Sequence, residues 1–525
     1  MPSFVGTCGV VLGELVARLW RSACRLLFHI LYVWKKPRLL PAAKDDLLLR
    51  SATSLAAAIR NGEVKSVELV SAYIGRIREV QPIINAVVEE RFQEALREAE
   101  EADQLVASAT MSRNQLSRQK PLLGLPFSVK NSIAVKGMRH DAGSLFWHGR
   151  RAEEDAPSVA LLRQAGAIPL VLTNVPELCM WSDSQNLVDG TTRNPHDTRR
   201  VPGGSSGGEG SLQASAGSLM GLGTDVGGSV RIPAAYCGIF GHKPTAGVVP
   251  NSGLFPDVQG PMAECFCVGP MARFSEDLAL LLNVLAGSAA NRLRLDEEVD
   301  LKTLRVYFTD NEGSLYFSRV TAEARGAVLK VTRRLKETHG INAMRLPVPE
   351  LYDFGAEWFK ACATVAPKPV AELFRPGGLN TLAELVRIVL GAGRHTLPAL
   401  FLSKMTSAFK FSSKHEAEAC FASADHIRDR LEETLGEDGV LILPVTPSTS
   451  PYHNQQLLFN DSASMTLLFS ILKTPATACP VMKSKDGLPL GVQVVAKRGN
   501  DRLCLAVARE IERQFGGWLQ PWAGL

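Results

Sequence analysis

Two glycine- and serine-rich segments and one upstream lysine are the residues of this chain best suited to chemistry. The first segment, Gly203-Gly-Ser-Ser-Gly-Gly-Glu-Gly210, contains two adjacent serines, and the second, Gly223 to Pro233, contains Ser229 directly after two glycines. A serine hydroxyl is a poor nucleophile until a neighbouring base removes its proton. Lys130 ends the apolar run 124–130 and can supply such a base, provided that burial keeps its amine neutral.

Generic patterns leave the chemistry of the first segment open. Both Ser205 and Ser206 satisfy G-x-S-x-G, but that nucleophile elbow also needs a downstream acid and a histidine. His395 and His453 follow, as some of the ten histidines would in any sequence. The spacing fits neither of the common phosphate-binding glycine loops. A purely structural interpretation also stands, in which glycines allow close backbone approach and serines cap local turns.

Composition indicates a globular chain that needs no metal. Apolar residues make up 46% and charged residues 21% of the 525 positions, a length that favours two or three domains. The net charge is only +5, and no basic stripe alternates with aromatic residues, so we expect no nucleic-acid partner. The ten cysteines and ten histidines lack zinc-ligand spacing, which predicts free thiols and no metal site.

The elements that would position these residues alternate between strands and helices. Short apolar runs predict buried strands at 124–130, 167–173, 304–309 and 440–446. Helical patterns extend over 66–81, where Pro82 would end the helix, and over 91–106, 158–164, 322–338, 416–435 and 502–514. Apolar residues recur through the glycine-rich stretch 202–247, so it must be packed. The alternation predicts an α/β fold with a buried sheet covered by helices on both faces.

The N-terminal segment is apolar enough to seek a membrane. The charges within residues 9–34 are spaced four, three, four and four apart, so they share one stripe of a helix: Glu14, Arg18, Arg21, Arg25 and His29. We expect residues 1–36 to form a membrane-seeking helix, either interfacial with this basic stripe toward the headgroups or transmembrane. A helix packed on the protein's own core is the alternative. A linker at 37–49 would follow.

The two serine segments resemble the signature of the amidase signature family. The resemblance rests on Lys130, on Ser205 in the double serine, and on Ser229 after Gly-Gly at the matching distance. It continues, over about residues 50–515, in three further motifs: Thr173-Asn174, Gly238-Ile-Phe-Gly-His-Lys-Pro244 and Gly487-Leu-Pro-Leu-Gly-Val-Gln493. The resemblance implies the amidase-signature α/β fold for residues 50–525, with a large mixed β-sheet at its core.

The resemblance also implies an acyl-enzyme mechanism that needs no cofactor. Lys130 would act as the base, Ser205 would relay the proton, and Ser229 would attack the carbonyl carbon. The backbone N–H groups implied to bind the oxyanion and the substrate are those of Val226, Gly227, Gly228 and Ser229. Residues expected to support or pack around the site, without reacting, are Ser206, Asp225, Arg231 and Cys179.

Within this family the sequence is most similar to the branch that hydrolyses fatty acid amides, in its N-terminally anchored form. Glu209 after the double serine, the N-terminal helix and the apolar region 376–410 carry this likeness. The expected reaction converts long-chain fatty acid amides, such as primary amides and N-acylethanolamines, to free acid and amine. Basic residues within 376–410 suit a membrane-facing cap, although ordinary core helices would have the same composition.

Two other functions stay open at this stage. One is an amidase-signature enzyme that acts on a small soluble amide, and the other is a catalytically silent lipid-binding protein on the same fold. The expected partners are a lipid amide and a membrane surface, either an intracellular membrane or a lipid droplet. The sequence leaves the oligomeric state open, a homodimer included.

Overall fold

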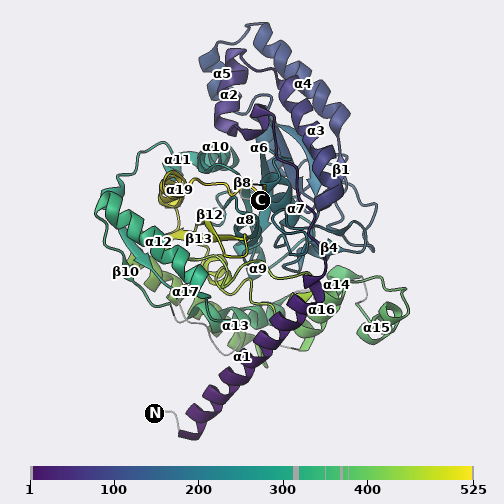
Figure 1. Cartoon of the computed structure of the whole chain (residues 1–525), viewed down its shortest axis with the longest axis vertical. Helices are drawn as coiled ribbons and strands as arrows, with labels where there is room; N and C mark the ends of the chain where they lie inside the picture. The colour runs from purple at the N-terminus through teal and green to yellow at the C-terminus, as the bar shows by residue number, and fades with distance from the viewer. Residues whose placement is uncertain are drawn as a thin grey trace.

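One large sheet organises the protein. The computed structural model describes residues 4–310, 318–348, 350–366, 370–375, 378–408 and 410–522. Within these ranges eleven strands pair in the order β1-β3-β2-β6-β8-β7-β12-β13-β11-β9-β10 (Figure 1). Their bounds are β1 (Val87–Glu90), β2 (Pro126–Lys130), β3 (Ile168–Thr173), β6 (Met220–Asp225), β7 (Phe240–Lys243), β8 (Cys267–Ala272), β9 (Arg305–Phe308), β10 (Met344–Arg345), β11 (Gly439–Pro444), β12 (Ala476–Lys483) and β13 (Pro489–Ala496). The short strands β4 (Gln185–Asn186) and β5 (Gly190–Thr191) pair separately.

The sheet is mixed, as expected. β2 runs parallel to β3 and β6, and β9 runs parallel to β10 and β11. The strands between them, from β6 through β8, β7, β12 and β13 to β11, pair antiparallel. Every residue of β2, β3, β6, β8, β11 and β13 is buried. Because successive side chains of a strand point to opposite faces, both faces of the sheet are covered, which confirms the α/β prediction.

Helices surround this sheet on the described part of the chain. Their bounds are α1 (Phe4–Val33), α2 (Ala52–Asn61), α3 (Ser66–Ile84), α4 (Phe92–Ala107), α5 (Arg113–Gln119), α6 (Pro157–Gln164), α7 (Gly207–Ala214), α8 (Arg231–Cys237), α9 (Pro261–Cys265), α10 (Ser275–Leu285), α11 (Ala290–Leu293), α12 (Ala322–His339), α13 (Glu350–Val365), α14 (Val370–Phe374), α15 (Thr381–Val389), α16 (Leu397–Ala408), α17 (Lys414–Leu435), α18 (Leu467–Ile471) and α19 (Asp501–Phe515). The predicted strands and helices agree with these bounds within two residues at each end, with one exception. Helix α3 continues past Pro82 and closes at Asn85, whose left-handed backbone caps it.

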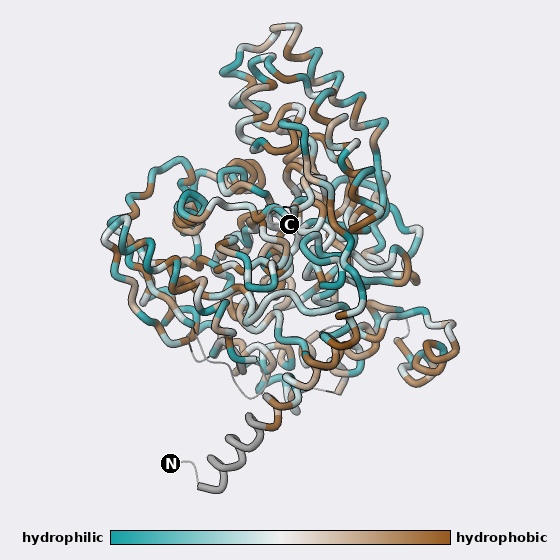
Figure 2. Tube along the Cα trace, in the orientation of Figure 1, coloured by the Kyte–Doolittle hydropathy of each residue, from teal (hydrophilic) through white to brown (hydrophobic). Residues whose placement is uncertain are grey.

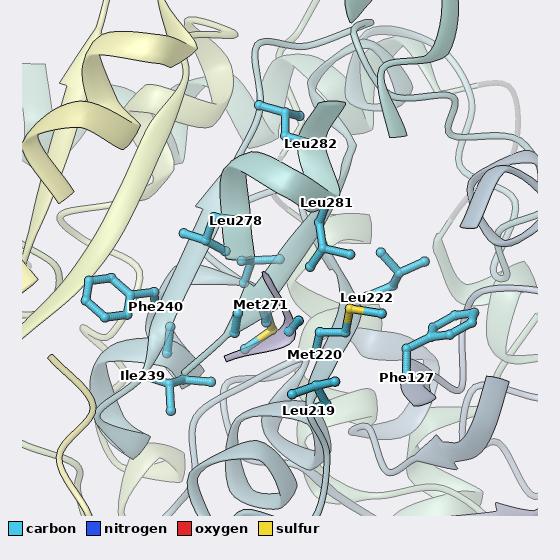
Figure 3. Close-up of a cluster of buried hydrophobic side chains, with 14 of the residues drawn as sticks. Phe127, Leu219, Met220, Leu222, Ile239, Phe240, Met271, Leu278, Leu281 and Leu282 are labelled. Atoms are coloured by element: carbon cyan, nitrogen blue, oxygen red, sulfur yellow. The ribbon is translucent and has the colours of Figure 1, made fainter. Parts of the chain in front are cut away.

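A dense apolar core lies behind the centre of the sheet. Leu219 and residues of β6 and β8 pack against Leu278, Leu281 and Leu282 of α10 (Figure 3). Phe127 of β2 belongs to the same cluster. Along β2 the side chains alternate, so Phe127 and Val129 lie on one face of the strand while Ser128 and Lys130 lie on the other. Burial of each large apolar side chain contributes about 1.5–3 kcal/mol, and this core makes β2 a firm support for Lys130.

Helix α1 projects from the body at the N-terminal end (Figure 1). No helix among the described residues is both long and apolar enough to cross a membrane, so the expectation of a transmembrane helix is not supported. The physical reason lies in the charged stripe, since each arginine near a bilayer centre costs about 2.5–3.5 kcal/mol.

The orientation of α1 differs from the expectation in one respect. Two residues of its basic stripe face the protein, because Arg21 is only 9% exposed and Arg25 donates to the hydroxyl of Ser318 at 3.4 Å. Tyr32 stacks on Tyr452 with ring centroids 4.9 Å apart, which fixes the C-terminal end of the helix. The exposed side carries large apolar residues instead: Leu19, Trp20, Leu26, Leu27, Ile30, Leu31 and Trp34. The prediction that the stripe meets the headgroups is therefore wrong for Arg21 and Arg25, while an apolar outer face is present.

Helices α15 and α16 form most of the region expected to be a cap (Figure 2). Residues 376, 377 and 409 of that region, and residues 1–3 of the N-terminal segment, lie outside the described residues. The apolar side chains on α15, on α16 and in the turn between them are between 40% and 85% exposed at Leu382, Leu385, Val386, Val389, Leu390, Leu397 and Phe401. These helices therefore expose one apolar side, although α16 also buries Ala399 and Leu400 against the body of the protein.

Candidate active site

Lys130 stands at the end of β2 and is completely buried. Its Nζ lies 2.7 Å from the hydroxyl oxygen of Ser205 and 2.7 Å from that of Thr224. Burial lowers the pKa of Lys130, and the nearby Cys179, Asp225 and Glu209 oppose this effect. The buried lysine that the sequence only allowed is thus present, and it contacts the first of the paired serines. The sequence analysis missed Thr224, which lies on β6 two residues after Leu222, the partner of Val129 in β2.

The double serine lies in the turn that leads into α7. Ser205 is 2% exposed, and Ser206 occupies the position that caps the helix. The Ser206 hydroxyl accepts from the backbone N–H of Thr224 at 3.3 Å, and the Ser206 N–H donates to the carbonyl of Ser229 at 3.2 Å. Ser206 therefore ties the turn to β6 and to the second serine segment, which agrees with the supporting role expected for it.

Glycine is required where this turn presses against its neighbours. A Cβ atom on Gly208 would lie 2.6 Å from the carbonyl oxygen of Asn174, so α7 can approach the end of β3 only without a side chain there. The N–H of Gly208 donates to that same carbonyl at 3.1 Å. The structural interpretation of the glycines is compatible with the chemical interpretation of the serines, because the close packing of α7 brings Ser205 into contact with Lys130.

Ser229 lies in the loop between β6 and α8 and is partly exposed, unlike Ser205 and Lys130. Among the described residues no hydrogen bond joins the Ser229 hydroxyl to Ser205. The two segments are connected instead through the backbone, by the bond from Ser206 to Ser229. Of the three serines only Ser229 is partly exposed, while Ser205 is buried against Lys130.

The loop Val226–Ser229 presents backbone N–H groups, but they are not all equivalent. The N–H of Gly228 donates to the carboxylate of Asp225 at 2.7 Å. Gly228 has a φ of 122°, and a Cβ atom there would collide with Thr466, whose hydroxyl donates to the carbonyl of Gly227 at 2.6 Å. In the described structure the N–H groups of Val226, Gly227 and Ser229 have no such intramolecular acceptor, whereas that of Gly228 holds the loop.

A buried ion pair anchors this loop. Asp225 accepts from Arg231 Nε and Nη2, both at 3.0 Å, and both side chains are fully buried. Burial alone would raise the pKa of Asp225, but Arg231 lowers it to about 2. Gln493 of β13 accepts from Arg231 at 2.9 Å, which gives the C-terminal motif a place at the site. Asp225 and Arg231 therefore pack and position, as expected, and the sequence did not reveal that they hold the loop.

The histidines expected of a nucleophile elbow are engaged elsewhere. His395 Nδ1 lies 2.6 Å from Glu177, and His453 Nδ1 lies 3.2 Å from Asp183. Among the described residues no hydrogen bond joins either histidine to Ser205, Ser206 or Ser229, so a serine–histidine pair is not formed. The described residues also contain no group of three His, Cys, Asp or Glu side chains that could hold a metal ion.

A cavity of about 320 Å³ has a lining that contains none of Lys130, Ser205, Ser206 or Ser229. It lies between the turn after β3, which contains the short helix η2 (Glu177–Cys179), and the helices α15 and α16. One wall is Trp181, whose carbonyl oxygen lies against Gly204 and whose ring contacts Phe401 edge to face at 6.3 Å. Trp181 thus contacts the serine turn through its carbonyl oxygen and α16 through its ring, while the cavity itself does not reach the serines.

Comparison with known proteins gives consistent similarities. The family model described as Amidase matches residues 68–505. Fatty-acid amide hydrolase 2-A of Danio rerio is 43% identical over 491 residues, which cover 92% of this chain and 92% of that protein. Fatty-acid amide hydrolase 2 of Homo sapiens is 38% identical over 519 residues, covering 97% and 96%. The solved structure of 6-aminohexanoate cyclic dimer hydrolase with substrate is 25% identical with a TM-score of 0.73, covering 91% of this chain and 99% of that chain.

Proposed function

This chain belongs to the amidase family, and we propose that it hydrolyses long-chain fatty acid amides through a relay of Lys130, Ser205 and Ser229. The expected substrates are primary amides and N-acylethanolamines, which are converted to a free fatty acid and ammonia or an amine. The observation that carries the proposal is the 2.7 Å contact between the buried amine of Lys130 and the hydroxyl of Ser205, next to an accessible serine.

The first half of the reaction forms an acyl-enzyme. Neutral Lys130 accepts the proton of Ser205 while Ser205 accepts the proton of Ser229, and the Ser229 oxygen attacks the amide carbon. The carbon–nitrogen bond then breaks, and the proton held by Lys130 passes through Ser205 to the departing nitrogen. In the second half a water molecule loses its proton through the same relay and attacks the ester, which releases the acid. No cofactor is required.

Two physical conditions support these roles. A lysine must be uncharged to act as a base, and complete burial disfavours its charged form. The developing oxyanion needs backbone donors, which Val226, Gly227 and Ser229 can supply, while Gly228 serves the bond to Asp225. Loss of one such donor typically lowers a rate by about 10²–10³-fold.

The exposed apolar surface of α16 supports a long-chain substrate. Trp181 contacts Gly204 through its carbonyl oxygen and Phe401 of α16 through its ring, so it lies between this surface and the double serine. An acyl chain held along Trp181 would place its amide near Ser229. Two relatives that are 43% and 38% identical carry the names fatty-acid amide hydrolase 2-A and fatty-acid amide hydrolase 2.

We also propose how the chain is organised around a membrane. Residues 1–36 would be an interfacial helix, 37–49 a linker and 50–525 the amidase domain, with 376–410 as a cap on an intracellular membrane or a lipid droplet. The apolar outer face of α1 and the exposed residues of α15 and α16 flank Leu457 and Leu458, which are also exposed. One apolar surface of this kind suits docking to lipid. Pairing of two copies through this face would instead give a homodimer in the absence of lipid.

Covalent labelling with a fluorophosphonate probe tests the nucleophile. Labelling should disappear in Ser229→Ala and largely persist in Ser206→Ala, the matched control from the adjacent turn. If the folded Ser229→Ala and Ser206→Ala variants both lost labelling, the nucleophile would have to be assigned to the double serine. Absence of labelling in the folded parent protein would favour a silent lipid-binding protein.

Amides of graded acyl length test the substrate class. We expect kcat/KM to rise with chain length, measured against Ser229→Ala as the blank. Equal or better turnover of short polar amides would contradict the proposal and favour an amidase of soluble substrates. Full solubility without detergent or lipid would support that same alternative.

A further inference from the structure

Glu209 is a buried carboxylate next to the relay that the proposed mechanism does not use. It lies in the first turn of α7, four residues after Ser205, and is fully buried. Its Oε2 accepts from the hydroxyl of Ser128 at 2.6 Å and from Gln213 at 2.9 Å, and its Oε1 accepts from the hydroxyl of Thr173 at 2.8 Å. One side chain thus joins β2, β3 and α7.

The surroundings of Glu209 are shaped to receive it. A Cβ atom on Gly221 of β6 would collide with the carboxylate, so this strand makes room by having glycine opposite. Ser128, the strongest donor by distance, is two residues before Lys130 on the same face of β2. Glu209 of α7 therefore lies against β2, on the face of the strand from which Lys130 also projects.

We propose that Glu209 is a positioning residue for Lys130: it fixes the 128–130 segment against α7, and its negative charge sets the pH at which the lysine becomes neutral. This inference rests on the proposed role of Lys130 as the base. Three donors face the carboxylate, and an ionised carboxylate can accept a hydrogen bond from each of them. A negative charge at this place favours the protonated lysine and so opposes the effect of burial.

The ionisable groups around Lys130 all raise its pKa. Lys130 faces Cys179 from η2, Asp225 from β6 and Glu209 from α7, and each of them opposes the lowering of its pKa by burial. Burial raises the pKa of Glu209 to about 7, although its three hydrogen bonds and Lys130 lower it. The carboxylate of Glu209 therefore carries its negative charge above about pH 7.

The test is the pH dependence of kcat/KM in Glu209→Gln, which keeps the shape and removes the charge. Protonation of Lys130 stops turnover, so activity falls on the acidic side. Without the negative charge the pKa of Lys130 decreases, and the acidic limb should shift to lower pH by about one unit or more, the effect of one nearby charge. Glu209→Asp keeps the charge but cannot reach Ser128, so it should lower kcat and leave the limb nearly in place.

Asp277→Asn is the matched control. Asp277 is also a fully buried carboxylate with three donors, and burial raises its pKa to about 6, but it caps α2 and does not face Lys130. Its substitution should leave the acidic limb unchanged. An unshifted limb in folded Glu209→Gln would overturn the role of Glu209. If Lys130→Ala kept the parent's turnover and acidic limb, the proposed function itself would fail, which separates the two outcomes.

Discussion

Neutralising Asp225 should weaken both the fold and the reaction, because this carboxylate holds the loop that carries Ser229. In Asp225→Asn the guanidinium of Arg231 stays fully buried without its counter-charge. Breaking a buried ion pair by removing one partner costs about 3–5 kcal/mol. Unfolding of 525 residues, at about 2.1 cal/mol/K each, has an entropy of about 1.1 kcal/mol/K. The expected decrease in Tm is therefore about 3–5 °C.

Calorimetry and turnover measure the two effects separately. The N–H groups of Gly228 and Val230 donate to Asp225, at 2.7 and 3.2 Å, and lose a charged acceptor. Misplacement of the oxyanion donors should lower kcat by about 10²-fold or more. The folded pKa of Asp225 is about 2, below its ordinary value of 3.8, so its stabilising contribution is complete above pH 3.8 and is lost as the pH falls through 2. The difference in Tm between parent and variant should shrink over that range.

Two further variants decide whether this reasoning is correct. Asp438→Asn removes a carboxylate from the exposed pair with Arg305, which is worth about 0–1 kcal/mol, so its Tm should change by about 1 °C at most. Asp225→Asn combined with Arg231→Met removes both buried charges and should regain much of the lost stability, but not the lost turnover. The reasoning is refuted if Asp225→Asn is no less stable than Asp438→Asn, or if the double variant regains full kcat.

Three further changes test the site, the packing and the surface. Lys130→Ala should lower both kcat and the rate of fluorophosphonate labelling by about 10²–10⁴-fold at neutral pH, since the general base is lost; unchanged labelling of folded protein would contradict its role. Gly208→Ala should lower Tm because its Cβ would press on the backbone of Asn174, whereas Gly75→Ala, with open space around it, should not; equal Tm values would argue against close packing of α7. Val389→Asp places a charge at a position 85% exposed and should weaken co-sedimentation with lipid vesicles, so unaltered binding would exclude α15 from the membrane contact.

Local patterns were enough to predict four of the eleven strands of the sheet, β2, β3, β9 and β11, and several of the helices. Runs such as 168–173 are buried on both faces, so their continuous apolar character is visible without any knowledge of neighbours. The place of Lys130 at the end of an apolar strand was compatible with burial, but only the structure shows that the lysine is buried. The helix at 66–84 was predicted too short, because a proline in the last turn does not prevent the few residues after it from staying helical.

The orientation of α1 could not be read from its sequence. The spacing of Arg21 and Arg25 places them on one stripe, but it does not say whether that stripe meets lipid headgroups or the protein. Acceptors such as the hydroxyl of Ser318, which is 293 positions away in the sequence, come close to Arg25 only in the folded chain. The side of α1 that points away from the protein is therefore apolar.

The sequence by itself determined that a lysine and three serines occur in a pattern suited to acyl transfer, because residue type and spacing are local properties. Only the tertiary structure decided which groups meet. The parallel register of β2 and β6 brings Thr224 within 2.7 Å of Lys130 across 94 positions, and close packing of α7 brings Ser205 to the same amine. Contacts of this kind depend on how distant segments align. The partners of Lys130 and the hydrogen bond from Gly228 to Asp225 are therefore visible only in the folded chain.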